Sequence, residues 1–191
     1  KFIFLQLITI KISFHLAFIL NNQKSMEQLS ERDVRIQKIN KMKKLGVVPF
    51  AQHFDKQQAI AKIVAEYNNK EMREIETIIP APEKQVKTAW RLMLYRSFGK
   101  LSFWTIMDGS EEIQVMFHRD NCKIDISTSA DEPKLVDSLW EWEEAMTAYK
   151  FMEKMVDVGD FIGVSWEVFK THKGELTIFV SEFKFLSKSV R

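Results

Sequence analysis

The chain has 191 residues, of which 46% are hydrophobic and 28% are charged, and its formal net charge is +2. This composition excludes a disordered protein, and so small a net charge gives no argument for nucleic acid by itself, because non-specific DNA-binding proteins carry dense basic patches. The single cysteine, Cys122, excludes an intrachain disulfide and indicates a reducing compartment, and the four histidines lack partners at metal-ligand spacing. If the chain binds a nucleic acid such as RNA, the binding must therefore come from a local arrangement of residues.

Residues 1–25 differ in composition from the rest of the chain. They are mostly apolar, are interrupted by Lys11, and precede the first acidic residue, Glu27. Their length and lysines fit a signal peptide or a membrane anchor, whereas the missing initial Met and the Phe/Ile/Lys/Asn bias resemble translated upstream DNA. Three interpretations stay open: an over-extended gene start before Met26, a targeting leader, and a genuine extension. A membrane partner is expected only if this stretch is real, and the fold prediction leaves it out.

Residues 26–83 are predicted to form an N-terminal segment with two helices. Between Leu29 and Leu45 apolar side chains recur at three-residue steps, and Gly46 supplies a stop signal. Beside them runs a basic edge that comprises Arg32, Arg35, Lys38 and Lys41. This edge is either a solvated face, favoured by the helix dipole near its C-terminal end, or a surface for RNA phosphates.

The second helix is predicted from apolar residues at positions i, i+3, i+4 and i+7 between Ile60 and Tyr67. Asp55 precedes Gln58 by three positions, which is the pattern of a capping box at the start of a helix. Asn68-Asn69 is expected to end it.

From about residue 84 the apolar period changes to two, which indicates β-strands, and Leu94 is expected on the same face as Leu92. Asp108-Gly109-Ser110 is a hairpin signal between two of the strands. The strands are expected at 84–95, 101–107, 112–118, 161–169 and 175–180.

A long helix is predicted between the third and fourth strands, beginning at Pro133. Its apolar side comprises Leu135, Leu139, Trp142, Met146, Tyr149 and Met152, and its other side carries Asp137, Glu141, Glu143 and Glu144. Five strands with one helix after the third is the order of an OB-fold barrel. The sequence therefore predicts a mainly β fold with α: a five-stranded OB-fold barrel over 84–191, preceded by two N-terminal helices, with a helical insert at about 121–155.

Two outward side chains of the predicted barrel suit an unpaired RNA base. Because Trp104 and Ile106 have the inward parity of their strand, Phe103 is expected to point outward, where it either stacks on a base or covers a loop or partner subunit. Gln114 has the same parity on the next strand. Its amide either reads a uracil edge or is an ordinary polar group of a solvated strand.

Charged residues complete the candidate set. Glu175 lies in a basic loop, where its carboxylate either accepts from a base N–H or pairs with Lys173. Arg91 and Arg96 either bind phosphate or a base or only solubilise their strand. The candidate RNA-binding residues are Phe103, Gln114, Glu175, Arg96, Arg91 and Lys100. No catalytic residue and no metal ligand is predicted.

Longer runs surround these residues. They are Arg35-x-x-Lys38 through Leu45-Gly46 and Pro49-Phe50 to Phe54, Gly99-Lys100-x-Ser102-Phe103, Asp108-Gly109, Ile113-Gln114-Val115, Gly159-Asp160-x-Ile162-Gly163, Phe169-Lys170-Thr171-x-Lys173-Gly174-Glu175-Leu176 and Leu186-Ser187-Lys188-Ser189. Together they resemble the N-terminal anticodon-binding region of lysyl-tRNA synthetase, a class II enzyme, over about 35–191 except the insert. Asparaginyl and aspartyl synthetases share the barrel but usually not the run 169–176.

The resemblance implies that Phe103 stacks on an anticodon base while Gln114, Glu175 and Arg96 read the uridine-rich lysine anticodon. It also implies lysine tRNA as the partner rather than DNA, a homodimer and a cytoplasmic location. The family enzyme joins lysine to its tRNA through a lysyl-adenylate, using ATP and magnesium. This chain stops at Arg191, where the family's catalytic domain begins, so no cofactor is expected in these residues and enzymatic activity is left open.

The chain departs from the family in three places. Trp90 and Trp166 stand where the family usually has glycine, and the stretch 121–152 is longer than usual. The acidic insert helix is expected to lie away from the anticodon or against a partner. Two alternatives therefore stay open: a free-standing OB-fold module that binds single-stranded RNA, and an interaction domain that works through the insert helix.

Overall fold

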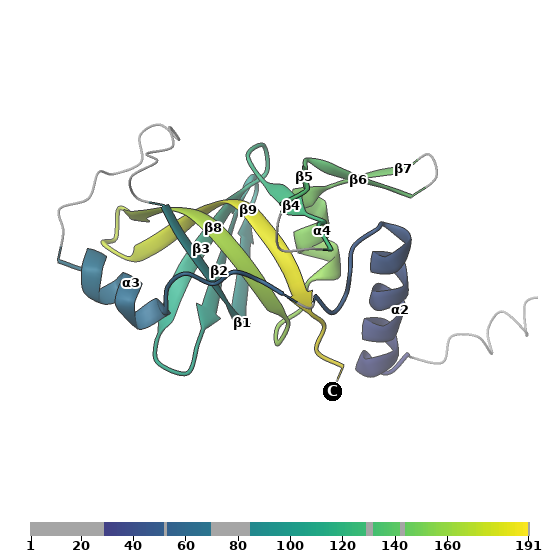
Figure 1. The fold of residues 1–191 in the computed structure, drawn as a ribbon, viewed down its shortest axis with the longest axis horizontal. Helices are drawn as coiled ribbons and strands as arrows, with labels where there is room; N and C mark the ends of the chain where they lie inside the picture. The colour runs from purple at the N-terminus through teal and green to yellow at the C-terminus, as the bar shows by residue number, and fades with distance from the viewer. Residues whose placement is uncertain (1–28, 52, 70–84, 129–131, 142–143, 191) are drawn as a thin grey trace, which may run out of the picture. The chain divides into compact units, whose positions relative to one another are not determined.

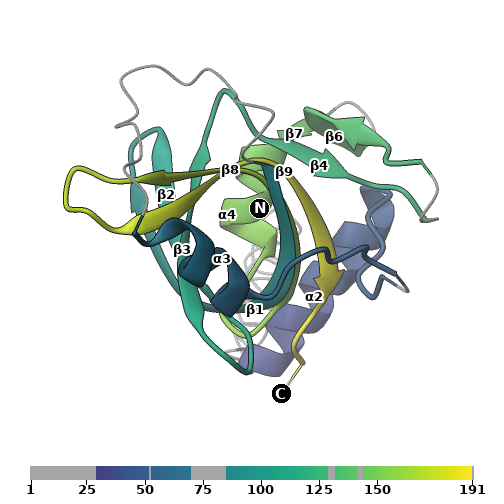
Figure 2. The same ribbon diagram turned by 60° about the vertical axis from the view of Figure 1, so that its left-hand side comes forward.

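Five β-strands pair side by side until they close into a ring (Figures 1 and 2). The computed structural model describes residues 29–51, 53–69, 85–128, 132–141 and 144–190, except the side chain of Trp166. In order of pairing, the strands of the ring are β3 (Glu112–His118), β2 (Leu101–Met107), β1 (Gln85–Phe98), β8 (Phe161–Lys170) and β9 (Leu176–Ser187). All five predicted strands are confirmed, although β9 continues beyond Val180 to Ser187.

The ring closes through β9. This strand runs antiparallel to β8, and its first half also pairs in parallel with β3, with Thr177 opposite Gln114. Its second half pairs in parallel with β4 (Lys123–Asp125), where Phe183 lies opposite Ile124. The short strand β5 (Leu135–Val136) adds to β4, so the sheet extends beyond the ring on that side.

An extra residue in β1 changes which of its side chains face the core. The register of β1 against β2 shifts between Leu92 and Leu94, so Met93 forms a bulge. Leu92 is fully buried, Leu94 is 44% exposed, and Tyr95 instead packs on Trp104 with ring centroids 4.5 Å apart. The prediction that Leu94 shares the face of Leu92 is wrong, because one extra residue reverses the alternation of all later side chains.

The two tryptophans at unusual positions lie in strands that change register nearby. The indole N–H of Trp90 donates to the hydroxyl oxygen of Thr88 at 2.7 Å, and the ammonium of Lys56 lies 2.9 Å from its ring centroid. The pairing of β8 with β9 shifts between Ser165 and Trp166. Irregular strands of this kind supply the extra bend that a glycine otherwise allows.

Aromatic side chains fill the inside of the ring. Trp104 and Phe117 are buried with their ring centroids 5.9 Å apart, and Phe183 lies 5.9 Å from Phe117. The helix α4 (Ala148–Met155), visible through the ring in Figure 2, adds Phe151 at 6.3 Å from Phe183. Because each aromatic buries about 150–250 Å² of surface, this cluster supplies much of the stability of the ring.

The segment between β3 and β8 contradicts the prediction of one long helix. After β4 and β5 it forms β6 (Ser138–Glu141) and β7 (Glu144–Thr147), which pair with each other, and only then α4. Trp142 and Glu143 of the predicted helix lie outside the described residues. The insert is therefore mostly β, with a helix of eight residues at its end.

Two local features explain this correction. Leu139 is buried from a strand and lies opposite Met146 across the hairpin, so the apolar spacing that suggested a helix also fits two paired strands. Thr147 is the N-cap of α4, and its hydroxyl oxygen accepts from the backbone N–H of Lys150 at 3.2 Å. A helix that starts at Ala148 cannot also run through the residues before its cap.

The first predicted helix is confirmed as α2 (Glu31–Lys44). Ile39 and Met42 are buried, and Gly46 follows the helix at φ +75°, a conformation that glycine adopts without strain.

Three residues of the basic edge of α2, Arg35, Lys38 and Lys41, form ion pairs within the protein. Lys38 pairs with Asp157, and Arg35 lies 3.9 Å from Asp160. Lys41 and the neighbouring Lys44 lie 3.8 and 3.6 Å from Glu141 of β6. These cations therefore neutralise acidic side chains of the same chain, an arrangement that neither sequence-based interpretation of the edge anticipates.

The second helix is confirmed as α3 (Ile60–Tyr67), but its predicted capping box is wrong. The N-cap is Ala59, which offers no side-chain hydrogen bond. Instead, the carboxylate of Asp108, at the turn between β2 and β3, accepts from the backbone N–H of Ile60 at 3.1 Å. A residue 48 positions away thus satisfies one of the backbone N–H groups in the first turn of the helix.

Several predictions fall outside the described residues. They concern the leader at 1–25 and the boundary between the helical segment and the strands at 83–84. Residues 35–191 form one compact unit, and of the unit 1–34 only the start of α2 and the two residues before it are described. No helix in the described ranges is long and apolar enough to span a membrane.

Candidate nucleic-acid interface

One outer face of the ring carries four of the six predicted RNA-binding residues. Side chains directly opposite each other on paired strands share a face. Arg96 of β1 lies opposite Phe103 of β2, and Phe103 lies opposite Met116 of β3. The next row comprises Thr105, Gln114 and Thr177. The face defined by Arg96, Phe103, Gln114 and Glu175 is called the Phe103 face below.

Arg96 reaches this face because of the bulge in β1. Without the extra residue at Met93, Arg96 would have the inward parity of Leu92. With it, Arg96 is exposed directly beside Phe103. The bulge thus places a cation next to the aromatic ring on the outside of the ring of strands.

Phe103 is half-buried on a small apolar cluster of its own. Met116, Phe169 and Phe179 pack outside the ring of strands, are each at most 6% exposed, and contact Phe103 and Leu101. This cluster is separate from the main core. The ring of Phe103 is therefore held from below and keeps part of its surface accessible, which is what a stacking platform needs.

Gln114 and Glu175 meet beside this platform. The amide nitrogen of Gln114 donates to the hydroxyl oxygen of Thr177 at 2.9 Å and to a carboxylate oxygen of Glu175 at 3.3 Å. Thr177 in turn donates to the backbone carbonyl of Glu175 at 3.2 Å. Both amide hydrogens are thus used within the protein, so the carbonyl oxygen of Gln114 and the second carboxylate oxygen of Glu175 remain as acceptors for a ligand.

The turn between β8 and β9 positions Glu175. Gly174 has φ +79°, and the hydroxyl oxygen of Thr171 accepts from the backbone N–H of Glu175 at 3.2 Å. The backbone N–H of Thr171 donates back to the carbonyl of Glu175 at 3.0 Å. Within the described chain Glu175 forms no ion pair with Lys173, so its hydrogen bond with Gln114 takes the place of the surface ion pair considered from sequence.

The other two predicted residues are engaged elsewhere. Lys100 forms an exposed ion pair with Asp120 at 3.2 Å, at the turn that follows β1. The guanidinium of Arg91 lies 4.8 Å from the ring centroid of Phe161. Arg91 itself pairs with Met107 of β2. Met107 is four residues beyond Phe103 on β2, about 13 Å along the strand, so Arg91 does not belong to the Phe103 face.

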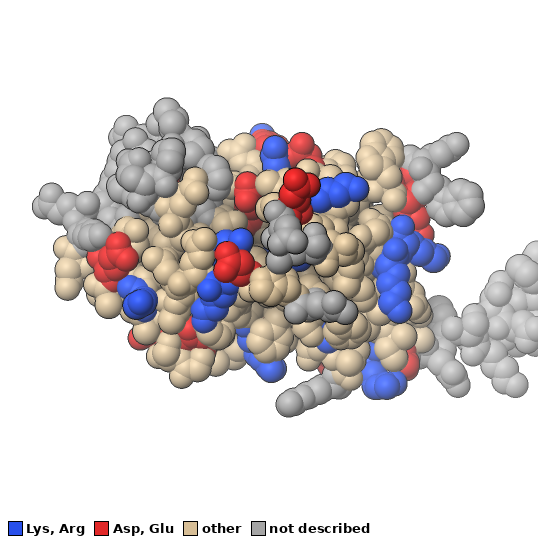
Figure 3. Space-filling model, viewed as in Figure 1, with Lys and Arg blue, Asp and Glu red and all other residues tan. Residues whose placement is uncertain are grey.

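The surface charge gives no broad electrostatic signal. On the side drawn in Figure 3, Lys and Arg side chains are interspersed with Asp and Glu. Non-specific nucleic-acid binding relies on a dense basic surface, whereas recognition by stacking and hydrogen bonds needs only a few groups in the right geometry. The Phe103 face is of the second kind.

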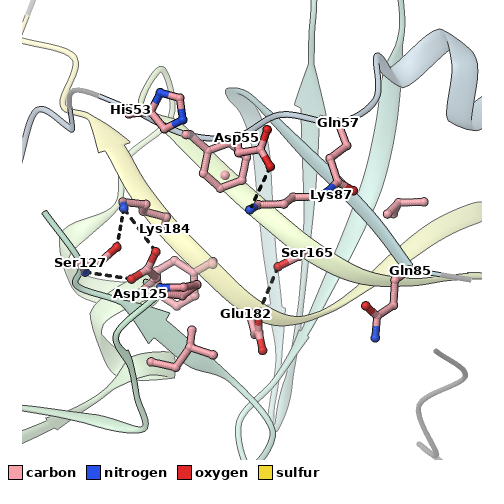
Figure 4. A pocket seen from close by; sticks show the side chains of 16 residues that line it. His53, Asp55, Gln57, Gln85, Lys87, Asp125, Ser127, Ser165, Glu182 and Lys184 are labelled. Carbon is pink, nitrogen blue, oxygen red and sulfur yellow. Dashed lines mark hydrogen bonds and ion pairs between the residues drawn. The ribbon is translucent and has the colours of Figure 1, made fainter. Parts of the chain in front are cut away.

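A cavity of about 210 Å³ is a weaker candidate site (Figure 4). None of the six predicted residues lines it. Its Lys184 donates to Ser127 at 2.8 Å and lies 3.3 Å from Asp125, and its Lys87 lies 3.9 Å from Asp55. Burial alone would raise the pKa of Asp125, but hydrogen bonds from Ser127 and other neighbours lower it below its ordinary value. The main charges of the cavity are thus already matched within the protein.

Reactive groups for catalysis do not gather in the described part of the chain. No three His, Cys, Asp or Glu side chains there are placed to hold a metal ion. Cys122 is buried, and the burial raises the pKa of its thiol far above the ordinary value. A thiol in this state is a poor nucleophile.

Sequence reasoning missed Thr177, which orients the Gln114 amide. Thr177 follows Glu175 by two positions and shares the outward parity of its strand. That parity was visible in the sequence, but the parallel pairing of β9 with β3 that brings Thr177 to Gln114 was not.

The chain is similar in sequence to several lysine–tRNA ligases. The relative from Chlamydia felis is 32% identical over 166 residues, which cover 86% of this chain and 29% of that protein. Those from Carboxydothermus hydrogenoformans and Christiangramia forsetii are 33% and 34% identical, over 83% and 87% of this chain and 25% and 24% of their own lengths. No protein-family model matches the chain.

These alignments cover most of this chain but little more than a quarter of the proteins that it matches. Several independent relatives carry the same name. The resemblance expected from the sequence motifs is therefore confirmed, and the chain is a homologue of the lysyl-tRNA synthetases over a limited part of their length.

Proposed function

We propose that this chain recognises the anticodon of lysine tRNA, as the N-terminal anticodon-binding part of a lysyl-tRNA synthetase. In this proposal the ring of five strands is an OB-type barrel, a fold that binds oligonucleotides on its outer face. One observation carries the proposal: Arg96, Phe103, Gln114 and Glu175 lie on one face although they come from four separate segments.

The chemistry of the face suits an unpaired pyrimidine. A base stacked on Phe103 gains about 1–3 kcal/mol. The carbonyl oxygen of Gln114 and the carboxylate of Glu175 are neighbouring acceptors, and uracil presents an imino N–H on its Watson–Crick edge. Arg96, opposite Phe103, supplies donors for a base oxygen or for the backbone phosphate.

The reaction of the whole protein is part of the same proposal. A complete lysyl-tRNA synthetase joins lysine to its tRNA with ATP and magnesium, as a homodimer in the cytoplasm. The residues of this chain would contribute the choice of tRNA rather than the chemical step. The alternative is a free-standing module that binds single-stranded RNA without reading its sequence.

The test compares the affinities of the chain for a lysine tRNA transcript and for an unrelated tRNA. Phe103→Ala is expected to weaken binding of lysine tRNA by about fivefold or more. Trp140→Ala is the matched control, because Trp140 is an exposed aromatic on β6, away from the Phe103 face. Melting temperatures of both variants show whether either loss comes from unfolding.

The outcomes separate the candidate functions. A loss confined to lysine tRNA supports anticodon reading, and an equal loss for both tRNAs indicates the free-standing RNA-binding module. If Phe103→Ala changes neither affinity, while charge reversal at Glu141 and Glu144 abolishes a binding activity, the chain works as an interaction domain through its insert.

A further inference from the structure

Phe98, the last residue of β1, exposes 62% of its surface right beside the Phe103 face. Its ring centroid lies 6.1 Å from that of Phe103, with the two planes at 68°. The two rings therefore touch edge to face, and most of the Phe98 ring stays open to solvent. Exposure of one aromatic side chain is ordinary at a protein surface, and Phe98 is distinguished by its contact with Phe103 and by the charged residues around it.

Phe98 extends a diagonal across the strands. Gln114 lies on β3 opposite Thr105, two residues along β2 from Phe103. Phe98 lies on β1 opposite Leu101, two residues from Phe103 in the other direction. Diagonal neighbours of this kind are about 7–8 Å apart. Gln114, Phe103 and Phe98 thus form three evenly spaced positions on one line. Such a line suits successive nucleotides of an extended RNA strand.

The position of Phe98 is fixed by the turn that follows it. Gly99 has φ +62°, and its carbonyl accepts from the guanidinium of Arg119 at 2.9 Å. The backbone N–H of Arg119 donates to the carbonyl of Lys100 at 2.9 Å, and Lys100 pairs with Asp120. The turn after β1 is therefore fixed by Arg119 and Asp120, the two residues that follow β3. A preordered ring loses little conformational freedom when a ligand covers it.

The cations around Phe98 favour a nucleic-acid ligand over an apolar one. Arg96 is exposed two residues before Phe98 and shares its outward parity. Arg119 is exposed at the adjoining turn, where the charge of the exposed Lys100 is paired with Asp120 at 3.2 Å. A flat apolar ring bordered by cations suits a base together with its phosphate.

We propose that Phe98 is a second stacking platform, which takes the unpaired nucleotide next to the one on Phe103. This inference rests on the proposed function, since it assumes an RNA strand on the Phe103 face. Because the ring planes stand at 68°, the two bases cannot stack on each other. The site therefore takes a splayed dinucleotide, with one base on each ring and the phosphate between them facing Arg96.

The first experiment measures the affinity for a lysine tRNA transcript of Phe98→Ala, Phe98→Leu and Phe98→Tyr. Ala and Leu are expected to weaken binding by about 5- to 150-fold, whereas Tyr, which keeps the flat ring, stays near the parent protein. Trp140→Leu is the control for loss of an equally exposed aromatic and is expected to change nothing, since Trp140 is 63% exposed. The salt dependence of binding should be the same in all variants, because no charge changes.

The second experiment decides whether Phe98 contacts RNA or only steadies Phe103. If Phe98 stacks its own nucleotide, the losses from Phe98→Leu and Phe103→Ala multiply in the double variant. If Phe98 acts only through the ring of Phe103, Phe98→Leu has no effect once Phe103 is Ala, and the proposal is overturned. A 2-aminopurine base placed in turn at each anticodon position reports the contact directly, since its fluorescence should respond to Phe98→Leu at one position only.

The outcomes also separate this proposal from the proposed function. If Phe103→Ala weakens binding and Phe98→Leu does not, only the second platform is wrong. If neither variant weakens binding, the proposed function fails, and the second platform fails with it.

Discussion

The amide of Gln114 donates to the carboxylate of Glu175 at 3.3 Å across 61 positions of sequence. Thr177 receives the other amide hydrogen at 2.9 Å, so the orientation of the amide is set from two sides. A flipped amide would turn its oxygen toward the Glu175 carboxylate and lose that bond, and Thr177 could donate to it only by giving up its own bond to the Glu175 carbonyl. The protein therefore presents a carbonyl oxygen, not an amino group, to whatever binds on the Phe103 face.

Thr177→Val removes the hydroxyl group that orients Gln114 while keeping the shape of the side chain. We expect the affinity of the folded protein for lysine tRNA to fall by about fivefold, because the amide can then turn away. The buried hydroxyl also makes two hydrogen bonds, so its loss should lower the free energy of unfolding by about 1–3 kcal/mol. Thr105→Val is the matched control on the same row, where no side-chain hydrogen bond to Gln114 is present. Equal losses in the two variants would show that the orientation of Gln114 does not matter.

Asp108→Asn should make stability less sensitive to acid. Burial alone would raise the pKa of Asp108, but hydrogen bonds from Ser110, Ile60 and Glu111 lower it below the ordinary value of 3.8. A depressed folded-state pKa contributes stability that is present above the ordinary value and is lost as the pH falls through the folded-state pKa. The parent protein should thus lose this contribution on acidification below about pH 4, and the variant has none to lose.

Urea unfolding at pH 7 and at about pH 3 measures this effect. At pH 7 the variant should be less stable by about 1–2 kcal/mol, since Asp108 caps α3 as well as the turn. The difference should narrow at the lower pH. If the difference in free energy of unfolding between the parent and Asp108→Asn stays constant or widens at the lower pH, the pKa of Asp108 is not lowered in the folded state.

Lys188→Met should destabilise the protein strongly. The ammonium of Lys188 is fully buried and donates to the carbonyl of Met155 at 2.6 Å, to Asp157 at 2.5 Å and to Asp160 at 2.7 Å. Its loss leaves the buried carboxylate of Asp160 without its nearest cation, which costs about 3–5 kcal/mol.

Lys123→Met is the control for Lys188→Met. Lys123 forms an exposed ion pair with Asp137 at 3.9 Å, so this variant should cost less than about 1 kcal/mol. Denaturant midpoints compare the two variants. Equal losses in the free energy of unfolding would show that the buried Lys188 stabilises the protein no more than an exposed ion pair does.

Gly163→Ala should also destabilise the protein, through a clash rather than a charge. A methyl group on Gly163 would lie 2.3 Å from the ring of Phe54, so the segment that carries Phe54 must move. We expect a cost of about 1–3 kcal/mol in the free energy of unfolding. At Gly109 a methyl group meets nothing within 4 Å, so a Gly109→Ala variant measured beside it should stay close to the parent.

Local patterns predict the strands and the outward direction of Phe103, because alternation is a property of each strand alone. They do not predict the bulge at Met93, since Leu94 is as apolar as Leu92 and no residue marks the shift. The presence of Arg96 beside Phe103 therefore depends on a feature that the alternation of β1 hides. The contact of Gln114 with Glu175 likewise depends on the pairing of β3 with β9, which no local pattern shows.

The insert shows the opposite failure, in which a local pattern is present but ambiguous. Apolar residues at Leu135, Leu139 and Met146 fit a helix by their spacing, yet Leu139 and Met146 face each other across a hairpin. The N-cap at Thr147 was the better signal, because a capping threonine marks where a helix begins. Asp108 as the cap of α3 could not be found this way, since it lies 48 positions from Ile60.

The parallel pairing of β3 with β9 also sets the order of events on the ribosome. β3 leaves the exit tunnel long before Thr177–Val180, so its second edge stays open while the intervening residues are made. An unpaired edge attracts other nascent chains, which makes this interval the most vulnerable to aggregation. Gln114 gains Glu175 and Thr177 as partners only after these residues emerge, so its amide has no fixed orientation while the residues between β3 and β9 are made.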